Sequence, residues 1–200
     1  MFINKNILLL TAHPDDEIMF FYPTIKNLIK YNNIHLLCLS NGDYENKGKT
    51  REKELYDLSC TIGFNKTTIY DFEDNIKLFW DSNKIVSILN DYIKRQNINI
   101  IFTFDSGGVS NHPNHISCCN SVINIKNIEL YMLESVSFYR KFLSFFDLLN
   151  ISKNNLNFYN FNLPQLIYYM SFHWSQFNWY RILFLFFSRY SFINSFTPLI

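Results

Sequence analysis

Short apolar runs alternate with amphipathic stretches over roughly the first 130 residues of the chain. A short run rich in apolar or β-branched residues is typical of a strand that is covered on both faces. Such runs occupy residues 7–10, 34–39, 67–70, 98–104 and 129–133. Between them, apolar positions at helical spacing predict helices over residues 17–29, 51–62, 81–95 and 116–125. This alternation predicts an α/β fold: a Rossmann-like, mostly parallel sheet with right-handed crossovers and helices on both faces.

The last third of the chain has a different pattern. After Asp147 the sequence contains no acidic residue, while aromatic side chains crowd residues 158–196. Its longest apolar run, 182–187, is far shorter than the ~20 residues that a membrane-spanning helix needs. Aromatic and apolar residues with few cations suit a surface buried at a membrane interface, and an apolar helix packed on the sheet explains the same pattern equally well. We therefore expect an aromatic-rich helical segment and a possible membrane contact.

Length and charge limit the possible organisation and partners. Two hundred residues suffice for one α/β domain with a sizeable core and are too few for two. We expect a single domain over residues 1–200, with the α/β core in 1–150 and the aromatic region in 151–200. The formal net charge of +1 creates no basic field, so nucleic acid is a poor partner.

The cysteines and the N-terminus bear on the compartment. No CxxC pattern or paired spacing joins Cys38, Cys60, Cys118 and Cys119. A reducing, cytosol-facing environment is the simplest explanation of unpaired cysteines. The first strand begins without a preceding apolar segment of the length found in signal peptides, so no signal peptide is expected.

Candidate chemistry begins directly after the first strand, in the sequence Thr-Ala-His-Pro-Asp-Asp-Glu at 11–17. In an open α/β sheet, the carboxyl ends of the strands form the edge where ligands bind. Acidic residues at the start of a helix also cap its free N–H groups, and Asp-Asp-Glu alone needs no other explanation. His13 beside them favours a functional site, in which His13 and Asp16 could hold a metal while Asp15 acts as a base.

A second histidine-containing stretch, His-Pro-Asn-His at 112–115, follows the strand over 98–104. A catalytic zinc takes three protein ligands and keeps one position open for water. His13, Asp16 and His115 form the best set, provided that the two strands lie near each other in the sheet. This spacing does not distinguish zinc from another divalent metal such as iron or manganese.

Such a site predicts hydrolytic chemistry. A bound zinc would polarise a substrate carbonyl and lower the pKa of its water. Asp15 could take a proton from that water and return it to a leaving nitrogen. His112, if protonated, could stabilise the oxyanion that forms.

These two motifs, AHPDDE at 12–17 and HPNH at 112–115, resemble the zinc-dependent de-N-acetylases of the LmbE-like superfamily. The resemblance is closer to the eukaryotic N-acetylglucosaminyl-phosphatidylinositol de-N-acetylases of GPI-anchor biosynthesis. Further similar stretches are AHPDDEIMFFYP at 12–23, KTREKEL at 49–55, TFDSGGVS at 103–110, HWSQ at 173–176 and FSRY at 187–190. The similarity covers nearly the whole chain.

The resemblance implies the same roles for the residues named above: three zinc ligands, one general base and one oxyanion partner. It also places Arg51 at a position associated with substrate contact, and Asp71 or Asp74 near the sugar. An exposed charge at a helix N-terminus explains Arg51 nearly as well. Asn114 stands where many bacterial relatives carry Asp, so it could orient His112 without favouring its cation.

The implied reaction is hydrolysis of the N-acetyl group of N-acetylglucosaminyl-phosphatidylinositol, which yields glucosaminyl-phosphatidylinositol and acetate. The implied partners are the glycolipid substrate and a membrane surface, at the cytosolic face of the endoplasmic reticulum. Relatives commonly start with a membrane-spanning segment that this sequence lacks, so either the sequence is shortened or the aromatic C-terminal region makes the membrane contact. Two alternatives stay open: a deacetylase of a soluble N-acetylglucosaminyl conjugate, and a non-catalytic membrane-bound scaffold.

Overall fold

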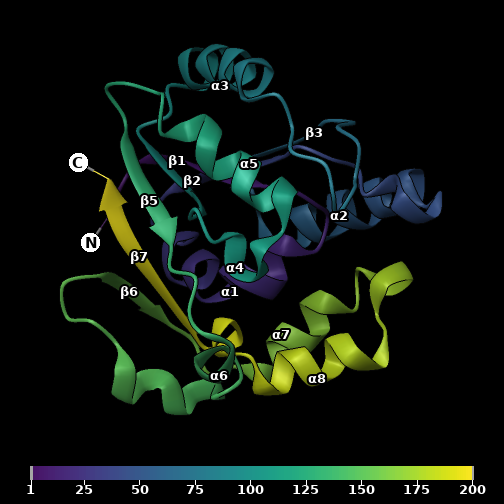
Figure 1. The fold of residues 1–200 in the computed structure, drawn as a ribbon, viewed down its shortest axis with the longest axis vertical. Helices are drawn as coiled ribbons and strands as arrows, with labels where there is room; N and C mark the ends of the chain where they lie inside the picture. Colours follow the sequence, from purple (N-terminus) through teal and green to yellow (C-terminus); the bar gives the residue numbers. More distant parts are fainter. Residues whose placement is uncertain (1, 200) are drawn as a thin grey trace.

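Seven strands form one mixed sheet within residues 2–199, the part of the chain that the computed structural model describes (Figure 1). They are β1 (Asn6–Thr11), β2 (Asn33–Cys38), β3 (Lys66–Ile69), β4 (Ile100–Phe104), β5 (Glu129–Leu133), β6 (Leu156–Tyr159) and β7 (Ile193–Leu199). Their order across the sheet is β3-β2-β1-β4-β5-β7-β6. Strands β1 to β5 pair in parallel, whereas β7 is antiparallel to both of its neighbours.

Helices cover both faces of this sheet. They are α1 (Asp16–Leu28), α2 (Gly48–Ile62), α3 (Ser82–Gln96), α4 (Gly108–Asn111), α5 (Pro113–Val122), α6 (Phe138–Lys141), α7 (Leu163–Met170) and α8 (Trp179–Phe187). Helices α3 and α5 pack together on one face, and α1 lies on the other, as right-handed crossovers require (Figure 1). The predicted α/β fold with a mostly parallel sheet is confirmed.

The strand order reverses between β1 and β4, which are neighbours at the centre of the sheet. Both strands are buried along almost their whole length, which explains their unbroken apolar sequences. The chain leaves β1 toward one face and β4 toward the other, so a crevice opens between the two carboxyl ends. This point in an α/β sheet is where ligands bind. The two histidine-containing stretches therefore meet at the centre of the sheet.

The helix predicted to begin at residue 116 begins earlier, at Pro113. His112 caps it, because its ring accepts a hydrogen bond from the backbone N–H of Asn114. Proline is well suited to the first helical position, where its missing N–H is not needed. His115 consequently lies in the first turn of α5, where the sequence suggested a loop.

The C-terminal region is only partly helical, which corrects the expectation of a helical segment there. Besides α7 and α8 it contains β6 and β7, so the sheet extends beyond residue 150. Figure 1 shows β7 running alongside β5. The sequence of β7 hides its burial because it includes two polar residues, Asn194 and Ser195, that are fully buried. Asn194 accepts a hydrogen bond from the Thr24 hydroxyl, 2.7 Å away, so a distant helix satisfies it.

Within residues 2–199 no helix combines the length and apolar character needed to cross a membrane. Helix α8 packs against the core along one side only. Leu185 is its one buried side chain, and Trp179 is 73% exposed. The run over 182–187 therefore lies in a helix that is packed on one side and exposed on the other.

Candidate active site

A cavity of about 220 Å³ opens at the carboxyl ends of β1 and β4. We call it the site cavity; it is lined by His13, Asp15, Asp16, Met19, Phe20, Arg51, Asp74, Ser110, His112, His115 and Arg181. The loop after β1 and the start of α1 supply the first residues. Helix α4 supplies Ser110, and the start of α5 supplies His112 and His115. All three predicted metal ligands and the predicted base therefore lie around one cavity.

Asp16 is an ionised carboxylate held in a fixed orientation. Its Oδ2 accepts hydrogen bonds from the backbone N–H groups of Ala12 (3.0 Å) and His13 (2.8 Å). Its Oδ1 lies 3.3 Å from Nε2 of His115. Burial alone would raise the pKa of this carboxyl, but His115 and His13 hold it below its usual range. One oxygen is thus fixed by the backbone, and the other faces an imidazole.

Hydrogen bonds to the far sides of both rings determine which nitrogen faces Asp16. Nδ1 of His115 lies 3.1 Å from the carbonyl oxygen of Gly108, which can only accept, so Nε2 carries the free lone pair. Nε2 of His13 lies 3.0 Å from Oδ1 of Asn114, which leaves Nδ1 of His13 toward Asp16 at 3.7 Å. The Asn114 amide is itself oriented, since its nitrogen donates to the carbonyl of Leu78.

One ligand atom from each of His13, Asp16 and His115 lies within 4.8 Å of the other two. Two imidazole nitrogens and one carboxylate oxygen are a donor set that suits a catalytic zinc. Each histidine also has the outward hydrogen bond that orients metal-binding imidazoles in proteins. These three residues therefore fit a divalent metal by both geometry and chemistry.

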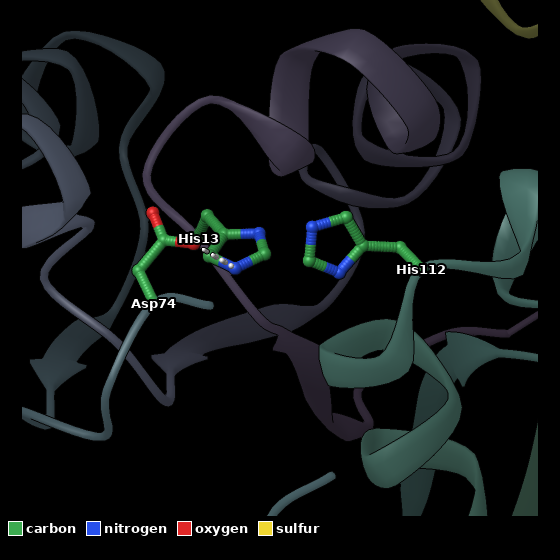
Figure 2. Close-up of side chains that lie close together, drawn as sticks. All are labelled: His13, Asp74 and His112. Atoms are coloured by element: carbon green, nitrogen blue, oxygen red, sulfur yellow. Dashed lines mark ion pairs between the residues drawn. The ribbon is translucent and has the colours of Figure 1, made fainter. Parts of the chain in front are cut away.

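A second group, formed by His13, Asp74 and His112, shares His13 with the first. Figure 2 shows the His13 ring between the Asp74 carboxylate and the ring of His112. Nε2 of His13 is 3.2 Å from Oδ1 of Asp74. Although burial opposes the cation, Asp74 and Asp16 raise the pKa of His13. Since Asp74 and Asn114 both face Nε2, we interpret both as residues that orient His13.

Asp15 lies beside this group but outside it. Its backbone has a φ of 110°, a conformation that is rare for a residue with a side chain and that is typical of strained functional sites. Its Oδ2 lies 2.7 Å from Nη2 of Arg181, and its Oδ1 lies 3.6 Å from Nη2 of Arg51. The carboxylate that the sequence proposed as a base is therefore buried and flanked by two guanidinium groups.

His112 contacts the ligand group through its ring, whose centroid is 4.8 Å from that of His115. Burial and the neighbouring His115 and His13 lower the pKa of His112 to about 4, so the ring is neutral near pH 7. Its Nδ1 accepts from the backbone N–H of Asn114, which puts the remaining proton on Nε2. The expected cation is not favoured, and the Asn114 side chain orients His13 and not His112. What the site contains is a neutral N–H donor.

The two predicted substrate-contact residues behave differently. Arg51 is buried, not an exposed helix-end charge, and donates to the carbonyls of Pro14 (2.6 Å) and Gly42 (2.9 Å). Asp71 is exposed and lines a neighbouring cavity without lining the site cavity. It is Asp74, three residues later, that lines the site cavity.

Sequence reasoning missed two contributions from the C-terminal region. Arg181 is the one charged residue in α8, and its guanidinium lies beside Asp15. Glu17, which the sequence leaves without a role beyond support of the helix start or of the residues around the metal, pairs with His173 inside the protein. A single arginine in an otherwise apolar helix is a signal that the sequence does contain, but the sequence does not show that Asp15 is its partner.

Solved structures with the same fold include two deacetylases. N,N'-diacetylchitobiose deacetylase from Pyrococcus horikoshii superposes with a TM-score of 0.67 and 18% identity, over 98% of this chain and 84% of that chain. A deacetylase of teicoplanin biosynthesis gives a TM-score of 0.67 at 10% identity, over 98% of this chain and 100% of that chain. At such identities the likeness concerns the fold alone.

Sequence comparison defines the family. The family model described as GlcNAc-PI de-N-acetylase matches residues 8–126. A probable N-acetylglucosaminyl-phosphatidylinositol de-N-acetylase of Dictyostelium discoideum is 34% identical over 96% of this chain and 93% of its own length. The N-acetylglucosaminyl-phosphatidylinositol de-N-acetylase of Bos taurus is 36% identical over 94% of this chain and 81% of its own length. The chain belongs to the GlcNAc-PI de-N-acetylase family, which confirms the resemblance read from its motifs.

Proposed function

We propose that this protein hydrolyses the acetamide of N-acetylglucosaminyl-phosphatidylinositol, releasing acetate and glucosaminyl-phosphatidylinositol, in GPI-anchor biosynthesis. The observation that carries the proposal is the convergence of His13, Asp16 and His115 beside Asp15 in one cavity. The family relationship supports the substrate, because the related proteins bear the name of this reaction.

His13, Asp16 and His115 would hold the metal, with zinc as the proposed ion. When bound there, zinc supplies a Lewis acid for the acetamide carbonyl and lowers the pKa of water toward neutrality. The backbone N–H groups of Ala12 and His13 fix the Asp16 carboxylate for this task. Asn114 and Asp74 hold His13, and the carbonyl of Gly108 holds His115.

Asp15 serves as the general base and then as the general acid. It takes a proton from water as the water oxygen attacks the carbonyl carbon, and it delivers that proton to the sugar nitrogen as the C–N bond breaks. The products are acetate and a free amine. Arg51 and Arg181 keep the Asp15 carboxylate oriented in the cavity. The Nε2–H of neutral His112 donates to the oxyanion of the tetrahedral intermediate.

The test is acetate release from a purified protein loaded with zinc. We expect acetate from N-acetylglucosaminyl-phosphatidylinositol, no release after removal of the metal by a chelator, and recovery when zinc is restored. Release from a soluble N-acetylglucosaminyl conjugate with none from the lipid would favour the soluble-substrate alternative. No release from either by zinc-loaded protein would favour the scaffold.

We also propose that the protein works on the cytosolic face of the endoplasmic reticulum membrane. Support comes from an apolar surface on α6, α8 and the 3₁₀ turn η2 (Ser144–Asn150), which lie together in Figure 1. We call it the aromatic face; its exposed side chains include Phe138, Tyr139, Phe146, Leu149, Trp179 and Phe186. Exposed aromatic and aliphatic side chains suit a membrane interface. The cysteines in residues 2–199 are all free, as expected in a reducing compartment.

A further inference from the structure

A second cavity, of about 540 Å³, opens beside the site cavity. We call it the apolar groove; it is lined by Met19, Phe142, Tyr180, Arg181, Leu183, Phe184 and Phe187. Its walls come from α1, the end of α6 and one side of α8. The volume is in the range of pockets that bind small organic ligands. Arg181 is its one charged lining residue.

The apolar groove adjoins the site cavity. Met19 and Arg181 line both. Phe20, a wall of the site cavity, packs edge-on against Phe184, a wall of the groove, at a ring-centroid distance of 5.6 Å. The two cavities are therefore neighbours with shared walls, and a ligand long enough to pass Met19 and Arg181 can occupy both.

Arg181 marks the junction between the two cavities. Its Nη2 is paired with Asp15, and its Nη1 donates to the backbone carbonyl and the side-chain oxygen of Gln176, each at 3.0 Å. The guanidinium is held by these contacts and not by the apolar walls. The junction between the polar cavity and the apolar one is thus a fixed guanidinium, one end of which is paired with Asp15.

We infer that the apolar groove binds an acyl chain of the lipid substrate; this inference rests on the proposed function. The substrate presents its groups in the order sugar, inositol, phosphodiester and acyl chains. The protein presents the site cavity, a cation and an apolar groove in the same order. Since α8 leaves Leu183 and Phe187 about half exposed, the groove has uncovered apolar area for a chain to bury.

The test uses two soluble substrates that share the same head group, so that no vesicle is present. One is the dihexanoyl form of N-acetylglucosaminyl-phosphatidylinositol, kept below its critical micelle concentration, and the other is the fully deacylated glycerol form. Each buried methylene is worth about a fourfold gain in affinity. We expect kcat/KM to be at least about tenfold higher for the dihexanoyl form.

Leu183→Gln and Phe187→Gln change the groove and leave the metal ligands untouched. Each should lower the dihexanoyl-to-deacylated ratio of kcat/KM at least about fivefold, because one wall becomes polar. Tyr168→Gln is the matched control: Tyr168 is an exposed aromatic residue on α7 that lines neither cavity, so its ratio should match that of the unmodified protein. Circular dichroism and the thermal midpoint check that each variant is folded.

A ratio near one in the unmodified protein would overturn the inference while leaving the deacetylase function intact. A ratio unaffected by both groove variants would overturn it as well. A third outcome would also overturn it: the groove variants differ from the unmodified protein in sedimentation coefficient but not in the dihexanoyl-to-deacylated ratio. The groove would then be a contact between two copies of the chain. If the protein deacetylates none of the three substrates (the dihexanoyl form, the deacylated form and the full-length lipid in vesicles), the proposed function is overturned together with the inference.

Discussion

Glu17 and His173 form an ion pair, with Oε1 of Glu17 only 2.6 Å from Nε2 of His173, and both side chains are fully buried. They are 156 positions apart in the sequence. The second oxygen of Glu17 accepts the backbone N–H of Asp15 at 3.1 Å. The C-terminal region thereby supports the strained backbone on which the proposed base sits.

Replacement of His173 should destabilise the protein. His173→Gln would leave the Glu17 carboxylate buried without its cation, and the loss of one partner of a buried pair typically costs about 3–5 kcal/mol. Urea titrations at pH 6 give the free energy of unfolding of each protein and thus the loss of stability in His173→Gln. The double variant Glu17→Gln/His173→Gln serves as the control and should lose less stability than His173→Gln alone. Equal stability of His173→Gln and the unmodified protein would contradict a structural role for the pair.

The same pair predicts a pH dependence of stability. Burial opposes the His173 cation, but Glu17 outweighs it and raises the pKa of His173 above 6.5. Because this pKa is raised in the folded state, the contribution of the His173 cation to stability is fully present below pH ~6.5. It is lost as the pH rises through the pKa of His173 in the folded protein. The stability difference between the unmodified protein and His173→Gln should therefore shrink from pH 6 upward. A difference that grows with pH would contradict the assignment.

Asp15→Asn tests the base separately from the metal site. The amide retains the size of the side chain but cannot accept a proton from water, so kcat should fall by about 10²–10⁴-fold. Bound zinc, measured by elemental analysis, should remain. Asp16→Asn is the matched comparison and should lose zinc. If Asp15→Asn loses zinc and Asp16→Asn keeps it, the two roles are exchanged.

Asn114→Ala tests the orientation of His13. Without the amide, Nε2 of His13 loses a partner at 3.0 Å, and loss of such an outer partner typically lowers metal affinity about 10–100-fold. Chelator competition measures the zinc dissociation constant. Asn120→Ala, at an exposed position on the same helix, should leave it unchanged. An unchanged dissociation constant in Asn114→Ala would show that Asp74 alone orients the ring.

Trp179→Ser tests the aromatic face. Trp179 is largely exposed, and its transfer into a lipid interface would bury a large apolar area. We expect the partition coefficient onto phosphatidylcholine vesicles containing phosphatidylinositol to fall roughly tenfold. The control is Tyr56→Ser, an exposed aromatic residue on α2, away from this face. Equal partitioning of all three proteins would exclude the aromatic face as the membrane contact.

The parts of the fold that could be predicted are those whose burial is evident from the local pattern of apolar residues. Strands β1 and β4 are covered on both faces, so they appear as unbroken apolar runs. Strand β7 is not predicted because it buries a polar residue, Asn194. The side chain of Asn194 bonds to Thr24 and to the carbonyl of Phe20, and no local sequence pattern indicates such distant partners.

The residues of the candidate site also differ in how far the sequence predicts them. The metal ligands lie in two short motifs, each at the end of a strand, and the parallel topology brings the motifs together. The contacts of Asp15 with Arg181 and of Glu17 with His173 link residues from opposite ends of the chain. Only the folded structure reveals these pairs, because a single charged residue in an apolar run does not specify its partner.

The position of these residues along the chain has a consequence for synthesis on the ribosome. All three proposed metal ligands lie at or before residue 115, so His173 and Arg181 are synthesised after them. The residues that support the catalytic carboxylate therefore enter the chain later than the residues that would hold the ion. A chain interrupted before His173 would lack both of these supports, so cleavage of the amide requires the later segment to be made and docked.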